Sequence, residues 1–209
     1  MLHYETLHPA SLELLKTLMS QDELHDMRLV GGTSLALQYG HRQSVDLDFF
    51  GKPQASQDEI IQMAERLGDL MILNHTKSIL QMVINGVKVD VVDYSCYEWI
   101  DEPRVEDGIV LASTKDIAAL KINAIEGRGT KKDFIDVYEL LKHYSLSDIL
   151  GFYSQKYPNY SIFRALLSLT YFEDAETQTM PIMFSTVSWE EIKKQIIVTI
   201  KSQNNFQSL

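Results

Sequence analysis

The stretch GGTSLALQYGHRQSVDLDFF, residues 31–50, decides the fold, because two carboxylates lie inside a run that is otherwise apolar and β-rich. Alternate residues of a strand point to the same face, so Asp46 and Asp48 should project together. The apolar residues expected to face the core are Val45, Leu47 and Phe49. Two neighbouring carboxylates repel each other unless a cation lies between them. A hard divalent ion with oxygen ligands, Mg2+ above all, would stabilise the pair.

A third carboxylate comes from VKVDVVDY, residues 87–94. Asp90 alternates with valines and shares its face with Lys88, whereas Asp93, a competing third acid, falls on the opposite face. If this strand lies beside the Asp46 strand, three carboxylates converge and can hold two metal ions about 4 Å apart, an arrangement that serves phosphoryl transfer. The alternative for Asp90 is a solvated strand face.

The opening GGTS is a candidate anion site. A strand that ends in Gly-Gly, followed by Thr and Ser at a helix start, exposes backbone N–H groups and a hydroxyl, and glycine lets a phosphate approach the backbone. Alone, the motif is a common strand-to-helix turn. Next to the D-x-D strand it predicts a phosphate cradle, made of Gly31, Gly32, Thr33 and Ser34.

The apolar periodicity predicts an α+β protein in which helices flank a mixed β-sheet core and the C-terminal half is all helical. We place the α/β core at 1–112 and a helical region packed on it at 113–209. Strands are expected over 27–32, 44–50, 70–76, 78–86, 87–94 and 109–113, with Asn-Gly at 85–86 closing a hairpin. Helices are expected over 8–21, 33–40, 56–68, 114–127, 131–144, 146–157, 161–169 and 188–203.

Local signals set several of these boundaries. Thr33 or Ser34 would cap the second helix, and Gly40 would end it. Two capping boxes are expected, Ser56 with Glu59 and Ser188 with Glu191. The acidic stretch 171–184 has no helical period and is predicted to be a loop.

Composition excludes several classes of protein. With 209 residues, 45% of them hydrophobic and 23% charged, the chain should be globular, and its net charge of −10 argues against generic attraction to nucleic acid or anionic membranes. A single cysteine rules out an internal disulfide. No stretch approaches the roughly 18 apolar residues of a spanning helix, and the N-terminus lacks a leader pattern. We therefore expect a cytoplasmic protein with no membrane partner.

These motifs resemble the signature of the nucleotidyltransferase fold, in which G-[GS]-T/S is followed by D-x-D. More narrowly, residues 31–50 are similar to the opening motif of the AbiEii/AbiGii toxin family, with its Gly-Gly-Thr, its His-Arg pair and its Ser-x-Asp-hydrophobic-Asp. VKVDVV resembles the family's K-x-D strand, and LKINAIEGRGTKKDFIDVYELL resembles its helical Lys, Arg and Lys-Asp motif. The resemblance spans most of the chain, and no motif position departs from the pattern.

The resemblance implies roles for the motif residues. Asp46 and Asp48 would bind the Mg2+ that carries the triphosphate, and Asp90 would bind a second ion and help to deprotonate the acceptor hydroxyl. Gly32, with Thr33 or Ser34, would hold the β- and γ-phosphates. The remaining residues that it places at the nucleotide are Gly31, Lys88, Arg42, Lys121 and Arg128. Arg42 would contact phosphate or acceptor, or would only pair with Asp46.

The segment 115–132 carries five basic and two acidic residues, so a basic strip beside the acidic cleft would suit a nucleotide. Lys121 and Arg128 lie seven residues apart on one helix face and could reach the same phosphates. Lys131 and Lys132 are expected to be solvated. Behind the site, Asp133 would orient Lys121 or Arg128 as a supporting group, and Asp136 would form a salt bridge.

We therefore expect a Mg2+-dependent enzyme that moves a nucleoside monophosphate from an NTP to a hydroxyl and releases pyrophosphate. By the resemblance it could be the toxin of a toxin–antitoxin pair, with an antitoxin protein partner and tRNA, other RNA or a protein as acceptor. One alternative is kinase-like phosphoryl transfer at the same site, because metal geometry alone does not say which phosphorus is attacked. Another is a nucleotide-binding partner module with little turnover.

Overall fold

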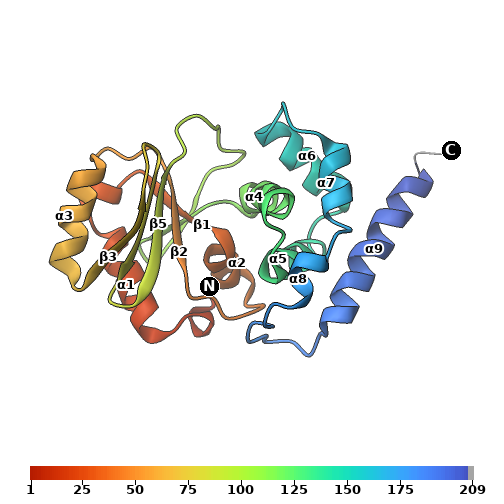
Figure 1. Cartoon of the computed structure of the whole chain (residues 1–209), viewed down its shortest axis with the longest axis horizontal. Helices are drawn as coiled ribbons and strands as arrows, with labels where there is room; N and C mark the ends of the chain where they lie inside the picture. The colour runs from red at the N-terminus through yellow and green to blue at the C-terminus, as the bar shows by residue number, and fades with distance from the viewer. Residues whose placement is uncertain (207–209) are drawn as a thin grey trace. The chain divides into compact units, whose positions relative to one another are not determined.

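The computed structural model describes residues 1–206, with side chains described as far as Ser202. The chain forms two compact units: Met1–Glu98 together with Glu102–Ala112, and Trp99–Asp101 together with the chain from Ser113 onward. The first unit is a mixed sheet flanked by helices, and the second is built of helices (Figure 1). The predicted fold class is therefore confirmed.

The sheet of the first unit has seven strands in the order β3-β4-β5-β2-β1-β7-β6. Their bounds are β1 Met27–Val30, β2 Leu47–Gly51, β3 Leu70–His75, β4 Ile79–Ile84, β5 Val87–Asp93, β6 Arg104–Glu106 and β7 Ile109–Leu111. Two neighbouring pairs are parallel, β2 with β5 and β1 with β7, and the other pairs are antiparallel. The two strands that carry the predicted acids therefore lie side by side in the middle of the sheet.

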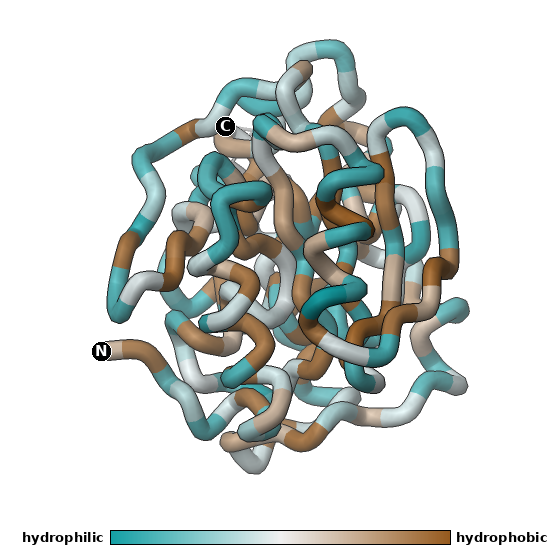
Figure 2. The backbone as a smooth tube through the Cα atoms, turned by 90° about the vertical axis from the view of Figure 1, so that its left-hand side faces the viewer, coloured by the Kyte–Doolittle hydropathy of each residue, from teal (hydrophilic) through white to brown (hydrophobic). Residues whose placement is uncertain are grey.

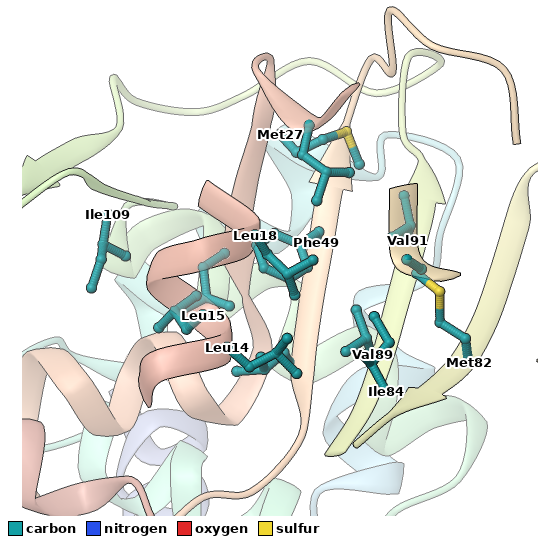
Figure 3. Packing of buried hydrophobic residues seen from close by; sticks show 14 of the residues in the cluster. Leu14, Leu15, Leu18, Met27, Phe49, Met82, Ile84, Val89, Val91 and Ile109 are labelled. Carbon is teal, nitrogen blue, oxygen red and sulfur yellow. The ribbon is translucent and has the colours of Figure 1, made fainter. Parts of the chain in front are cut away.

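Three α-helices accompany this sheet: α1 Pro9–Met19, α2 Gly31–Tyr39 and α3 Gln57–Leu67. Short 3-10 turns cover Tyr4–Thr6 and Asp22–Leu24. Apolar side chains of α1 pack beside Phe49 of β2, while those of β4 and β5 continue the same core (Figure 3). Hydrophilic and hydrophobic residues alternate along the helices in Figure 2, as helices that bury one face require.

Local signals explain several of the boundaries. Ser56 and Glu59 form the expected capping box of α3. Gly40 ends α2 in the left-handed conformation, with φ of 67°, and donates its N–H to the carbonyl of Ala36. The Asn85-Gly86 turn has φ of 50° and 81°, the pattern that a tight hairpin between β4 and β5 needs.

Several boundary predictions were wrong. Helix α2 begins at Gly31 rather than Thr33, and no side chain caps it. Strand β2 begins only at Leu47, so Val45 lies before it and is 51% exposed instead of facing the core. Strand β6 was not foreseen, because its three residues, Arg104–Glu106, include only one apolar residue between two charged ones.

The second unit contains six α-helices among the described residues: α4 Thr114–Gly127, α5 Lys131–Leu140, α6 Leu146–Lys156, α7 Ile162–Ser168, α8 Glu173–Glu176 and α9 Trp189–Phe206. Helix α4 contacts α5, α6 and α7. Helix α8 lies in the stretch predicted to be a loop, while the side chains of Ser188 and Glu191 bond each other's backbone N–H as expected. None of the described helices is both long and apolar enough to cross a membrane.

A buried ion pair organises this unit. Lys156 Nζ lies 2.7 Å from Asp116 Oδ1, and both side chains are fully buried. The same carboxylate accepts the backbone N–H groups of Ile100 and Asp101 and the hydroxyl of Ser113. Asp116 thus joins the 99–101 segment to α4.

Candidate active site

The register of the sheet places two of the three predicted acids next to each other. Strands β2 and β5 are parallel, and Asp48 and Asp90 are direct Cα partners across them. Partners in register project from the same face of a sheet. The two carboxylates therefore share one face at the centre of the sheet. Asp93 falls on the other face, and its Oδ1 accepts the N–H of Ser95.

The carboxylate of Asp90 is unevenly satisfied. Its Oδ2 accepts hydrogen bonds from Lys88 Nζ at 2.8 Å and from Gln81 Nε2 at 2.7 Å. Its Oδ1 is buried and has no hydrogen-bond partner in the part of the chain that the structure describes. Leaving a buried acceptor unpaired costs about 1–3 kcal/mol of stability. A donor or a cation that reached Oδ1 would remove this cost.

The pKa of Lys88 reflects the electrostatic field at the site. Burial lowers the pKa of its ammonium, but the hydrogen bond to Asp90 and the negative field of Asp90, Asp48 and Asp46 outweigh burial and raise that pKa overall. All three predicted acids therefore act on one point beside β5. The ammonium of Lys88 thus lies in the combined field of three carboxylates.

Gly31 leaves the space that the Asp48 carboxylate occupies. The residue has φ of 68°, a region that glycine tolerates and other residues rarely adopt. A Cβ at this position would collide with the Asp48 carboxylate. The glycine at the start of α2 therefore lets the carboxylate lie against the helix N-terminus.

The hydroxyl groups of the GGTS motif serve the fold in this structure. Thr33 is 1% exposed; its Oγ1 donates to the carbonyl of Asp46 and lies 2.8 Å from Ser44 Oγ. Ser34 is fully buried and accepts from Gln38 Nε2. Thr33 thus anchors the segment that carries Asp46. At the start of α2, the GGTS motif therefore exposes mainly backbone groups rather than hydroxyls.

Two further predicted residues lie in the segment between α2 and β2. Arg42 is 2% exposed, and its Nη1 donates to the carbonyl of Gln43 at 2.9 Å. Asp46 is half-buried and precedes the first residue of β2.

Among the side chains that the structure describes, no group of three or more His, Cys, Asp or Glu residues is arranged to hold a metal ion by itself.

The basic residues predicted downstream meet in the second unit. Lys121 Nζ lies 3.0 Å from Asp133 Oδ1 and 2.6 Å from Asp136 Oδ2, and all three side chains are at most 6% exposed. Arg128 Nε also donates to Asp133, although 67% of its side chain is exposed. Two further donors to Asp133 are the N–H and hydroxyl of Thr130. Lys121 and Arg128 do converge, as their spacing implied, and they converge on this carboxylate.

Charge and hydrogen bonding affect the pKa of the Asp133 carboxyl more strongly than burial does. Desolvation alone would raise the pKa of this carboxyl, but Lys121, Arg128 and Thr130 together hold it far below its usual range. Asp133 is therefore a stable anion that orients both basic groups, the role suggested for it from the sequence.

The expectation of a solvated Lys131 was wrong. Lys131 is 6% exposed, and its Nζ donates to the carbonyls of Glu176 and Gln178 and lies over the Trp189 ring. With Lys121 also buried, the basic segment 115–132 does not form a continuous exposed strip. The local excess of positive charge in sequence is largely neutralised within the helical unit.

Two residues beside the acids were not singled out from the sequence. Gln81 is the direct partner of Asp90 on β4, and Asn74 is the direct partner of Gln81 on β3. Asn74 Nδ2 donates to Gln81 Oε1 at 3.3 Å. The alternation of β4 could have indicated that Gln81 faces the acids, but nothing local indicates the position of Asn74.

Comparison with known proteins decides the family. The family model described as nucleotidyl transferase AbiEii toxin, type IV toxin–antitoxin system, matches residues 13–203. The chain belongs to this AbiEii family. It is accordingly a nucleotidyltransferase, and the resemblance found in residues 31–50 is confirmed. An uncharacterized protein of Aquifex aeolicus is 34% identical over 190 residues, which cover 87% of this AbiEii chain and 90% of that protein.

Solved structures show the same fold at low identity. JHP933 from Helicobacter pylori is 20% identical with a TM-score of 0.55, covering 97% of this chain and 96% of that chain. MenT4, a nucleotidyltransferase toxin from Mycobacterium tuberculosis, is 11% identical with a TM-score of 0.56, covering 91% and 82%. The antibiotic-resistance factor ANT(2'')-Ia is 16% identical with a TM-score of 0.53, covering 69% and 89%. The AbiEii chain thus shares its fold with a nucleotidyltransferase toxin and with an antibiotic-resistance factor.

Proposed function

We propose that this AbiEii protein transfers a nucleoside monophosphate from an NTP to a hydroxyl group, with Mg2+ held by Asp46, Asp48 and Asp90. The observation that carries the proposal is the pair Asp48–Asp90, aligned on one sheet face beside the N-terminus of α2. A nucleotide brings phosphate groups that need backbone donors and a divalent ion that needs carboxylates. The backbone N–H groups at the start of α2 and the carboxylates of Asp48 and Asp90 would supply these two kinds of partner.

The residues present fit a divalent cation. The donors are carboxylate oxygens, which hard cations prefer, and the buried Oδ1 of Asp90 lacks a partner among the described residues. Magnesium is usually held by one or two carboxylates plus the phosphates of its substrate rather than by an all-protein cage. The lack of a ready-made three-ligand group in the described chain is therefore compatible with a site that nucleotide completes.

The chain's own groups account for the steps of the transfer. The N–H groups of the first turn of α2, at Gly31 and Gly32, have no partners within the helix and would donate to phosphate oxygens. The acceptor oxygen attacks the α-phosphorus, the bond from that phosphorus to the β-phosphate bridge breaks, and pyrophosphate leaves. Asp90 would take the proton that the acceptor hydroxyl loses. Bound Mg2+ would supply charge neutralisation at the α-phosphate and the leaving group.

Lys88 has a role in the same account. Its ammonium lies 2.8 Å from Oδ2 of Asp90. With metal and nucleotide bound at the carboxylates, the Lys88 ammonium would turn toward a phosphate oxygen. We therefore keep Lys88 as a nucleotide-binding residue. Arg128, exposed over most of its side chain and held by Asp133, is the second basic group that we assign to the nucleotide.

The acceptor hydroxyl belongs to a second substrate, whose class the family helps to identify. The family is one of toxins of type IV toxin–antitoxin systems, which favours a cellular macromolecule as the target and implies an antitoxin partner. With net charge −10 and most of the basic segment paired, an RNA acceptor would bind through few phosphate contacts. We propose tRNA or a protein hydroxyl as acceptor.

One labelling experiment tests the reaction. The protein is incubated with Mg2+, total RNA and each NTP, labelled either at the α- or at the γ-phosphate. We expect label on RNA or on protein from an α-labelled NTP and none from the γ-labelled one. Transfer of the γ-label instead would show kinase-like chemistry at the same site.

Matched variants connect the reaction to the site. Asp90→Asn should abolish transfer, whereas Asp93→Asn on the same strand and the opposite face should leave it unchanged. Full activity of Asp90→Asn would overturn the assigned site. NTP binding without transfer in the wild type, under all acceptors tried, would instead favour a binding module.

A further inference from the structure

We infer that Gln81 and Asn74 are positioning residues that fix the rotamer of Asp90 for metal binding. The inference rests on the proposed function, because it assumes that Asp90 is a ligand. Three consecutive strands supply the row: Asn74 of β3 is the partner of Gln81 of β4, which is the partner of Asp90 of β5. The next partner in the same row is Asp48 of β2. One polar row thus runs from the sheet edge to the acids.

The hydrogen bonds in this row have a definite direction. Gln81 has an amide whose oxygen and nitrogen face different neighbours. Asn74 Nδ2 donates to Gln81 Oε1 at 3.3 Å, and Gln81 Nε2 donates to Asp90 Oδ2 at 2.7 Å. With its oxygen engaged by Asn74, the Gln81 amide presents its nitrogen, a donor, to the carboxylate. Asn74 therefore sets the orientation of Gln81.

The consequence for Asp90 is that one oxygen is occupied and the other is kept for a ligand. Lys88 and Gln81 both donate to Oδ2, and among the described residues nothing donates to Oδ1. If Lys88 turns to a phosphate, Gln81 remains the group that holds Oδ2. Groups that bond the second oxygen of a ligating carboxylate orient it, and their loss typically lowers metal affinity or activity 10- to 100-fold.

The backbone of β3 is built to place Asn74 in the row. The pairing with β4 shifts between Ile72, which faces Met82, and Asn74, which faces Gln81, so Leu73 is an extra residue. Without this bulge, Leu73 would face Gln81 and the amide would have no partner on that side. Bulges commonly re-aim a side chain next to an active site. The irregularity and the hydrogen-bonded row are separate observations that support the same role.

The test compares Gln81→Met with the wild type, because methionine has about the same length and no hydrogen-bond donor. The ligand is Mn2+ with inorganic triphosphate, which avoids any choice of base, and its dissociation constant is measured by electron paramagnetic resonance. We expect about 10-fold weaker Mn2+ binding. Asn74→Ala should weaken binding less, because the Gln81–Asp90 bond remains. The matched control is Ile79→Val, on the same strand and sheet face.

Melting temperature in EDTA separates positioning from folding. A positioning role requires that Gln81→Met melts close to wild type and yet binds Mn2+ more weakly, whereas unchanged Mn2+ affinity would overturn it. If Gln81→Met does not fold, Gln81→Asn, a shortened amide that cannot reach Oδ2, carries the same expectation. Asp90→Asn distinguishes the two levels: if it retains transfer, the proposed function fails, and if it is inactive while both Gln81 variants bind Mn2+ normally, only the positioning role fails.

Discussion

The acids of the first unit and the acids of the second differ in how completely they are satisfied. Asp133 accepts five hydrogen bonds, from Lys121, Arg128 and Thr130, and both of its oxygens are used. Asp90 accepts two, both on one oxygen, while the other oxygen is buried without a partner among the described residues. Both clusters looked functional in the sequence. The structure distinguishes a cluster whose carboxylate is saturated from one that keeps a spare acceptor among the described residues.

This difference has a physical meaning. A buried carboxylate surrounded by donors stabilises one arrangement of the chain and gives little to a ligand. Neighbouring carboxylates repel each other, which costs stability that a bound cation can offset. The second kind of cluster is the one expected where binding energy is used for chemistry.

The largest effect that we expect on stability comes from Lys121→Ala. The change leaves Asp133 and Asp136 charged, buried and without their lysine, which typically costs about 3–5 kcal/mol. The matched change Lys88→Ala should cost less than about 1 kcal/mol, because 38% of the Lys88 side chain is exposed. Urea unfolding of both variants measures the contrast. Equal costs would remove the distinction between the two clusters.

The next effect concerns the glycine beneath Asp48. Gly31→Ala forces a left-handed conformation on alanine, at about 1–2 kcal/mol, and its Cβ would push the Asp48 carboxylate away. We expect lower stability together with loss of transfer. As a control, Gly127→Ala in α4 meets no atom within 4 Å and should be neutral or stabilising by up to about 1 kcal/mol. Full transfer by Gly31→Ala would show that the position of Asp48 does not matter.

A third effect depends on pH. The pKa of Asp133 lies far below its unfolded value, so its contribution to stability is present above that unfolded value, about 4, and is lost as the pH falls toward the folded pKa. Wild-type stability should therefore fall steeply below about pH 4. Asp133→Asn should be less stable at neutral pH and should lose less on acidification. Melting curves between pH 7 and pH 2 decide; parallel curves for the two proteins would contradict the assignment.

The smallest effect on stability is expected for Arg128→Ala. Its side chain is 67% exposed, and Asp133 keeps Lys121 and Thr130 as partners, so the cost should stay below about 1 kcal/mol. If Arg128 contacts the nucleotide as we propose, the KM for NTP should rise while the melting temperature stays nearly constant. An unchanged KM would leave Arg128 with the stabilising cluster.

Much of the fold could be predicted because its signals are local. Alternation in residues 79–93 and the Asn-Gly turn specify the hairpin of β4 and β5, and the same period of two puts Lys88 and Asp90 on one face. Capping residues such as Ser56 fix helix starts by hydrogen bonds within three residues. These features need no knowledge of distant contacts.

The features that could not be predicted depend on contacts between residues that are far apart in the sequence. Nothing local to Thr33 indicates that its hydroxyl bonds the carbonyl of Asp46, thirteen residues on. Lys131 looked solvated, yet it bonds carbonyls forty-five and forty-seven residues away. Asn74 joins the row beside Asp90 only because of an extra residue in β3, and no local pattern indicates that shift.

The most direct test of the central claim is the response of Asp48→Asn to Mg2+, measured as the melting temperature with and without the ion alongside transfer of α-label. Replacing one carboxylate by an amide relieves repulsion and removes a ligand for a hard cation. We expect the variant to melt at or above the wild-type temperature without metal, to gain no stability from Mg2+, and to transfer no label, whereas the wild type should be stabilised by the ion. A variant that unfolds, or one that keeps full turnover, would show that these carboxylates are structural.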